Sequence, residues 1–177
     1  MPKMNTEMVT AIRSIITMNK SFFEQKLVLI SIVFLLLFTA CNQHVLMDEN
    51  LAVDDEGWDY RNRAGFEVSI EDTSALHAFY LNVRQNESYR YGNLYIFLHT
   101  TFPNGTLTHD TIECVLAQPD GKWLGKTSGS YISNQILLNE SLRFPLAGQY
   151  RFEIEQAMRE EKLHGITDIG IRIETLK

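Results

Sequence analysis

The stretch NLYIFLHTTFPNGTLTHDTIECVLA (residues 93–117) consists of two runs of β-forming residues joined by a turn signal. Asn104-Gly105 is a favoured pair in two-residue hairpin loops, because both central residues of such a turn adopt positive φ. A loop of two residues would place Phe97 opposite Ile112 and His99 opposite Asp110. In that register one face, which we predict to belong to the core, carries Tyr95, Phe97, Ile112, Cys114 and Leu116.

Similar short runs, separated by turn signals, continue on both sides of this hairpin. Eight runs in all, with no long helical period, indicate an antiparallel all-β sandwich of the jelly-roll kind over residues 58–177. Residues 155–162 (EQAMREEK) are compatible with a turn or two of helix. The runs are FEVSI (66–70), LHAFYLNVR (76–84), NLYIFLHTTF (93–102), LTHDTIECVLA (107–117), SYISNQILL (130–138), LRFP (142–145), QYRFEIE (149–155) and ITDIGIRIETL (166–176).

The N-terminal region is typical of an exported lipoprotein. Residues 27–38 (LVLISIVFLLLF) form an apolar run of signal-peptide length, shorter than the roughly 20 residues of a spanning helix. Basic residues precede this run, and Thr39-Ala40-Cys41 follows it as in a lipobox. We therefore predict a signal peptide over residues 1–40. We expect Cys41 to carry a diacylglycerol and an acyl chain such as palmitate, which is enough lipid for stable membrane attachment.

The start of the chain is longer than such a signal needs. Starting at Met18 would give a lipoprotein signal of ordinary length, so we expect residues 1–17 to be an over-extended start. Residues 41–57 are polar and acidic after the cysteine, and we predict a lipidated N-terminus followed by a flexible tether.

The charge balance excludes several classes of partner. Residues 41–177 hold 12 Lys and Arg against 20 Asp and Glu, a formal charge of −8. Nucleic-acid binding requires a basic patch that neutralises phosphates, so we expect no nucleic-acid partner. The same balance disfavours holding anionic lipid by charge, which leaves the lipid on Cys41 as the anchor.

A second stretch, DGKWLGKTSGS (residues 120–130), is superficially similar to a nucleotide-binding loop. Only three residues separate Gly121 from Gly125, where a Walker A loop needs four, and Asp120 stands where the first glycine belongs. The following Ser-Gly-Ser is also a poor start for the helix that such a loop requires. We expect no nucleotide binding here.

No residue pattern points to catalysis, a metal or a cofactor. The histidines are scattered without ligand spacing, and the sequence has neither a nucleophile elbow nor a zinc-protease motif. Cys114 lies in an apolar stretch and is interpreted as a small core residue. Four aromatic residues, Trp58, Tyr89, Tyr91 and Trp123, are predicted to form a surface for partner contacts.

The order of several segments, together with the lipobox, closely resembles the gliding-motility lipoprotein GldH family of the Bacteroidetes. The resemblance implies a non-catalytic envelope lipoprotein associated with gliding motility and the linked type IX secretion machinery. Its implied partners are other envelope proteins of that machinery, and only Cys41 transfers as a functional position. The matching segments are residues 91–95 (YGNLY), 102–105 (FPNG), 110–111 (DT), 119–126 (PDGKWLGK), 143–145 (RFP), 148–159 (GQYRFEIEQAMR) and 166–174 (ITDIGIRIE).

A glycan- or peptidoglycan-binding sandwich module is the alternative from a different class. It would need the four aromatic residues to line one exposed concave face.

For location, the first acidic residues after Cys41 are Asp48 and Glu49, so the charge cluster that goes with surface display is absent next to the lipid. We therefore expect an outer-membrane lipoprotein whose domain faces the periplasm.

Overall fold

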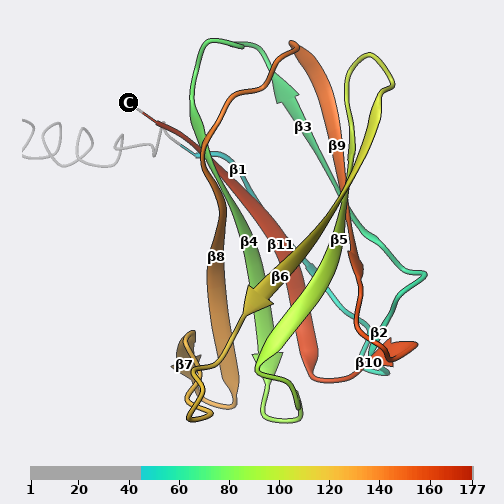
Figure 1. Ribbon diagram of the computed structural model, residues 1–177, viewed down its shortest axis with the longest axis vertical. Helices are drawn as coiled ribbons and strands as arrows, with labels where there is room; N and C mark the ends of the chain where they lie inside the picture. Colours follow the sequence, from blue (N-terminus) through green and yellow to red (C-terminus); the bar gives the residue numbers. More distant parts are fainter. Residues whose placement is uncertain (1–44, 177) are drawn as a thin grey trace, which may run out of the picture. The chain divides into compact units, whose positions relative to one another are not determined.

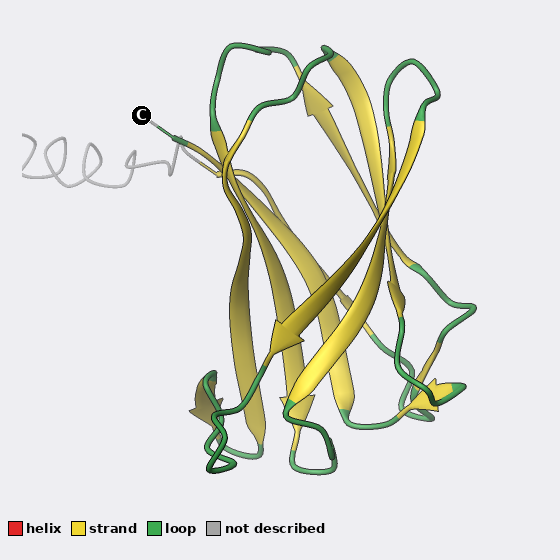
Figure 2. Cartoon of the chain, in the orientation of Figure 1, coloured by secondary structure: helices red, strands yellow, loops and turns green. Residues whose placement is uncertain are grey.

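The computed structural model describes residues 45–176, which form two antiparallel β-sheets packed face to face (Figures 1 and 2). The predicted signal peptide, the predicted lipidation site at Cys41 and the proposed start at Met18 lie outside these residues. Within the described range there is no helix long and apolar enough to cross a membrane. The sandwich predicted from the eight β-type runs is confirmed.

The two sheets draw their strands from distant parts of the chain. The five-stranded sheet has the order β1 (Val45–Ala52), β11 (Ile166–Thr175), β4 (His77–Asn86), β8 (Tyr131–Leu142) and β7 (Lys126–Ser128). The four-stranded sheet has the order β3 (Ala64–Ile70), β9 (Gly148–Gln156), β5 (Asn93–Thr101) and β6 (Leu107–Val115). A separate two-stranded ribbon pairs β2 (Trp58–Asp59) with β10 (Lys162–Leu163).

Strict alternation of apolar and polar residues builds the core between the sheets. In β3, Phe66 and Val68 are buried while the residues between them are exposed. Phe152 and Ile154 of β9 are buried in the same way. Successive side chains of a strand point to opposite faces, so each of these strands presents one apolar row to the core and one polar row outward.

The central hairpin forms, but its predicted register is wrong by one residue. The amide of Gly105 donates to the Phe102 carbonyl, and the Phe102 amide donates to the Thr106 carbonyl. These bonds close a loop of three residues, with Gly105 at φ 82°, rather than the two-residue loop that we predicted. A shift of one residue turns every side chain of one strand to the other face.

The shift has direct consequences for the predicted core face. Leu94, Ile96 and Leu98 are the buried apolar residues of β5, whereas Tyr95 is exposed and Phe97 is half-buried. On β6 and just after it, Cys114 and Leu116 are fully buried as predicted. Ile112 is half-buried and packs against the core.

The predicted flexible tether is wrong for residues 45–52. Residues 45–52 form strand β1, which pairs with β11 along its whole length. Asn50 lies opposite Gly170, where a side chain would collide with β1. Asp48 and Glu49 point to opposite faces of the strand, and both are exposed because β1 lies at the edge of its sheet.

The strand positions also decide the expectations for residues 155–162, for residues 142–145 and for the loop-like stretch. Residues 155–162 form no helix, since β9 continues to Gln156 and a turn leads into β10. LRFP is not a separate strand: β8 ends at Leu142, and Phe144 follows it as a buried residue. Lys126 and Thr127 of the loop-like stretch lie in β7, which is a strand and not the start of a helix.

Candidate functional site

Two of the four predicted surface aromatic residues are core residues. Trp58 and Tyr89 are each only 3 % exposed. The Trp58 indole Nε1 donates to the Asn62 carbonyl at 2.9 Å, and the Tyr89 hydroxyl donates to the Asn93 carbonyl at 2.7 Å. Both polar tips are thus satisfied inside the fold, as buried Trp and Tyr require. These two residues do not contribute to an exposed surface.

The other two aromatic residues pack against Tyr89. The rings of Tyr91 and Trp123 lie 5.8 Å and 6.5 Å from the Tyr89 ring, and both side chains are half-buried. The Tyr91 hydroxyl donates to the Glu160 carboxylate, and this bond raises the Tyr91 pKa. Tyr89, Tyr91 and Trp123 together form a packing cluster at one end of the sandwich. The exposed aromatic face that the glycan alternative needs is not present among these residues.

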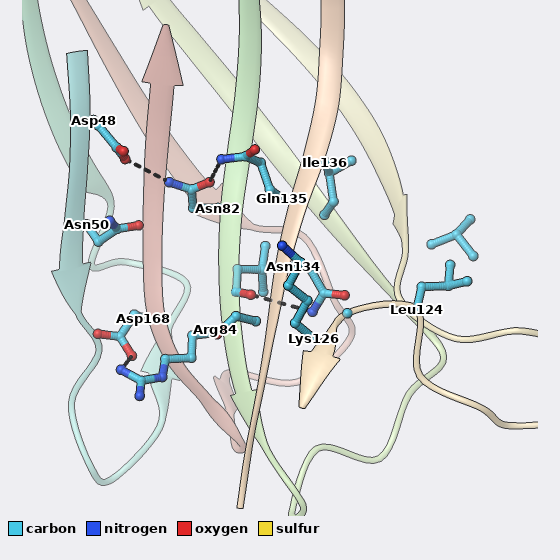
Figure 3. A pocket seen from close by; sticks show the side chains of 14 residues that line it. Asp48, Asn50, Asn82, Arg84, Leu124, Lys126, Asn134, Gln135, Ile136 and Asp168 are labelled. Carbon is cyan, nitrogen blue, oxygen red and sulfur yellow. Dashed lines mark hydrogen bonds and ion pairs between the residues drawn. The ribbon is translucent and has the colours of Figure 1, made fainter. Parts of the chain in front are cut away.

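A groove of about 870 Å³ lies elsewhere, around strand β8 of the five-stranded sheet (Figure 3). Its polar side is the outer face of β1, β11, β4 and β8. Its apolar side lies beyond the edge of β8, next to the end of β6 and the segment that leads into β7. Residues far apart in the sequence therefore meet here, from Asp48 at one end to Asp168 at the other.

Amide and carboxylate side chains form a ladder across the polar side. Asn82 Nδ2 donates to Asp48 Oδ1 at 3.2 Å, and Gln135 Nε2 donates to Asn82 Oδ1 at 3.2 Å. Asn82 and Asp48 come from strands on opposite sides of β11, and Gly170 lies opposite Asn82 on that strand. Because Gly170 has no side chain, the two polar groups meet over the middle strand.

Ion pairs flank this ladder. Arg172 on β11 pairs with Asp48 and with Glu174, and these carboxylates raise the Arg172 pKa. Nearer the other end, Arg84 Nη1 lies 3.8 Å from Asp168 Oδ2. The Arg84 guanidinium also lies over the Tyr131 ring, 4.6 Å from its centroid. The polar side thus mixes both charge signs with neutral amides.

The apolar side of the groove is unusually exposed for aliphatic residues. Val115 is 56 % exposed and Leu124 is 53 % exposed, and Ile136 on β8 is half-buried beside them. Strand β7 pairs with β8 only at Tyr131, Ile132 and Ser133. From Asn134 onward, β8 has no further strand on this edge in the described part of the chain.

A buried polar pair lies under the junction of the two sides. Asn134 is 7 % exposed, and its Nδ2 lies 3.4 Å from Oε1 of the fully buried Gln85. Gly125 lies directly against Asn134, since a Cβ at Gly125 would come within 2.5 Å of Asn134 Oδ1. The glycine that suggested a phosphate loop therefore serves a close approach between β7 and β8.

Cys114, the one cysteine in the described range, is fully buried, and burial raises its pKa to about 12. A thiol in that state is a poor nucleophile. No group of three His, Cys, Asp or Glu side chains within residues 45–176 is placed to hold a metal ion.

None of the groove residues was selected by sequence reasoning. The four aromatic residues that were selected lie in the core or against it. On β8, Ser133, Asn134 and Gln135 form an unbroken polar run, whereas on β4 the polar Asn82 and Arg84 alternate with the apolar Leu81 and Val83. The alternation on β4 marks an outer face, but it does not reveal which strands lie side by side.

Comparison with known proteins identifies the family. The GldH lipoprotein family profile matches residues 45–173. The chain is 32 % identical over 154 residues to "Gliding motility lipoprotein GldH homolog" of Christiangramia forsetii, covering 83 % of this chain and 94 % of that protein. It is 30 % identical over 146 residues to "Gliding motility lipoprotein GldH" of Flavobacterium johnsoniae, covering 78 % and 90 %.

Among solved structures, an insecticidal delta-endotoxin of Bacillus thuringiensis matches with 8 % identity and a TM-score of 0.38. That match covers 73 % of this chain and 24 % of the toxin, and a likeness this low has no bearing on function. The two lipoprotein relatives and the family profile confirm the resemblance seen in the sequence segments. The chain belongs to the GldH lipoprotein family.

Proposed function

We propose that this protein is a lipid-anchored, non-catalytic binding component of the gliding-motility and type IX secretion machinery. Cys41 would hold it in the outer membrane, with the sandwich on the periplasmic side. Family membership supports the link to motility. The single structural observation that supports a binding role is the groove around β8, which joins a hydrogen-bonded polar face to exposed aliphatic residues.

The geometry of the groove favours an extended protein segment as its occupant. A strand that adds to a free sheet edge gains main-chain hydrogen bonds, and its alternate side chains point to the two sides of the sheet. Beside β8 those two sides differ in chemistry. One side presents Gln135 and Asn82, and the other presents Leu124 and Ile136. A segment of alternating polar and apolar residues would satisfy both sides.

The anchoring part of the proposal is tested at Cys41. Replacing Cys41 with Ser removes the thiol that receives the lipid. We expect the Cys41→Ser protein to take up no fatty-acid label and to remain an uncleaved precursor or become soluble. Metabolic labelling with a clickable fatty acid measures this directly. Equal labelling of the wild-type and Cys41→Ser proteins would contradict the proposal.

The binding part is tested by crosslinking in native membranes with a matched pair of variants. Leu124→Asp introduces a charge on the apolar side of the groove, at a side chain that is already half exposed. Leu107→Asp is the control, because Leu107 is 71 % exposed on β6 and lies outside the groove. Both substitutions should leave folding intact, since neither removes a buried contact.

We expect Leu124→Asp to lose most of the crosslinks to other envelope proteins and Leu107→Asp to keep them. Quantitative mass spectrometry of affinity-purified tagged protein provides the measurement. If the two variants recover the same partners in the same amounts, the groove is not the docking surface.

A further inference from the structure

His99 and His109 face one another across the β5–β6 hairpin. They are direct partners in the strand register, and their Nδ1 atoms are 3.1 Å apart. The ring centroids are 4.6 Å apart with the planes at 70°. The sequence had suggested Asp110 as the partner of His99, and the three-residue loop brings His109 there instead.

From this pairing we infer that His99 and His109 form a binding site for one divalent transition-metal ion of the Cu²⁺, Ni²⁺ or Zn²⁺ type. Imidazole nitrogen is the ligand type that these ions prefer. Metal–nitrogen bonds of about 2.0–2.1 Å, at angles of about 90–110°, place two ligand nitrogens roughly 2.9–3.4 Å apart. The observed separation of 3.1 Å falls in that range.

The other nitrogen of His99 is held as metal-binding histidines usually are. His99 Nε2 lies 3.0 Å from Glu155 Oε2, and Arg63 Nε donates to the same carboxylate oxygen at 2.8 Å. The side chains of His99 and Glu155 are only 17 % and 15 % exposed. A carboxylate that accepts the Nε2–H of a histidine fixes its tautomer and leaves a lone pair on Nδ1 for the metal.

His109 supplies the second ligand from a more open position. Its ring packs against Phe97, with centroids 4.8 Å apart, which limits its rotation while leaving the residue exposed on β6. No third His, Cys, Asp or Glu of residues 45–176 joins the two nitrogens. Water would therefore complete the coordination, and a bound ion would exchange with solvent.

Metal binding has a defined proton requirement at this pair. Two lone pairs at 3.1 Å repel one another, so without a metal one Nδ1 must carry a proton and donate it to the other. Both Nδ1 atoms must present a lone pair to bind an ion. The metal thus takes the place of the shared proton, which moves to His109 Nε2 when that ring is neutral and leaves as H⁺ when Nε2 already carries a proton. A simple hydrogen bond between the rings is the competing explanation.

Titration of the full-length protein in detergent with CuCl₂, NiCl₂ and ZnCl₂ separates the two explanations. We expect one ion per chain by calorimetry, with the strongest binding for Cu²⁺ and none for Ca²⁺ or Mg²⁺. Electron paramagnetic resonance of the Cu²⁺ complex should show coupling to two nitrogens. A wild-type protein that binds none of the three ions would overturn the inference.

Three variants locate the ion. His109→Asn changes an exposed ligand, keeps the fold and should abolish the saturable site. His164→Asn is the matched control, since His164 is also exposed but lies between β10 and β11. Glu155→Gln should weaken binding by about 10–100-fold through loss of the partner that orients His99. Unchanged binding by His109→Asn would place the ion elsewhere and contradict the assignment.

Discussion

Cys114 illustrates how position decides what a side chain does. It lies on the inward face of β6, opposite Leu94, and both residues are fully buried. Burial in this apolar layer disfavours the thiolate and raises the Cys114 pKa to about 12. Cys41 is the same type of residue with a predicted covalent role, and the difference is set by the sequence around each cysteine.

The state of Cys114 leads to a test at the residue scale. We expect iodoacetamide at pH 8 to leave Cys114 unmodified in the folded protein, because the reactive thiolate is scarce and the sulfur is inaccessible. Denaturation in guanidinium should make the same thiol react within minutes. Intact-mass measurement distinguishes the two states. Rapid labelling without denaturant would show that β6 opens readily or that its register differs.

The burial of a residue could be predicted when it depends on the pattern of adjacent residues in the sequence. Phe66 and Val68 alternate with polar residues and are buried, as their pattern predicts. Trp58 and Tyr89 gave no such signal, because their burial depends on hydrogen bonds to backbone carbonyls formed only in the folded chain. The polar residues around Trp58 and Tyr89 in the sequence favour a surface position, whereas both side chains belong to the core.

At the scale of elements, the existence of a strand was easier to predict than its register. The hairpin was recognised from Asn104-Gly105, but Pro103 joins the loop, and the extra residue shifts the pairing. Strand β1 was missed because its exposed residues are acidic and its inward residues are few. An edge strand of this kind owes its order to β11 beside it, which lies more than a hundred residues later in the sequence.

The attachment of β1 depends on one glycine. A Cβ at Gly170 would come within 2.2 Å of Asn50 Oδ1 and 2.3 Å of the Glu49 carbonyl oxygen. The second atom belongs to the backbone and cannot rotate away. We therefore expect Gly170→Ala to lower the free energy of unfolding by about 1–3 kcal/mol through overpacking. The amides of β1 should also exchange with solvent faster.

Gly65→Ala is the control for this prediction. Gly65 also lies in a strand, and a Cβ there would meet only the end of the Arg151 side chain at 3.7 Å. Chemical denaturation and hydrogen exchange by mass spectrometry measure both variants. Equal stability of Gly170→Ala and Gly65→Ala would mean that β1 does not press on β11 as the register indicates.

At the scale of the whole molecule, the sandwich class followed from local patterns, whereas the groove did not. Asp48, Asn82 and Gln135 meet only because the sheet order places β1, β11, β4 and β8 side by side. No short-range periodicity encodes that order. The family could be recognised from the order of sequence segments, whereas the groove depends on the order of strands in the sheet.

The early start of β1 also changes how far the domain can lie from its anchor. Only Asn42, Gln43 and His44 separate Cys41 from β1, in place of the 16-residue tether that we predicted. The four Cα–Cα steps from Cys41 to Val45 span at most about 14 Å. Leu46 and Leu76 are exposed near the beginning of β1, and Leu76 accepts a hydrogen bond from the amide of the exposed Leu176. A lipidated Cys41 would hold this leucine-rich end close to the membrane surface.

The short connection sharpens the prediction about which side of the membrane the domain faces. With the first acidic residues at Asp48 and Glu49, inside β1, no flexible acidic segment adjoins Cys41. We therefore expect the domain to remain in the periplasm.

A non-penetrating protease such as proteinase K should leave it intact in whole cells and degrade it once the outer membrane is permeabilised. Because a folded sandwich resists proteases, the permeabilised sample also needs mild denaturant, with a known surface lipoprotein and a known periplasmic protein as controls. Loss of the domain from intact cells under the same denaturant, while the periplasmic control survives, would place it on the cell surface.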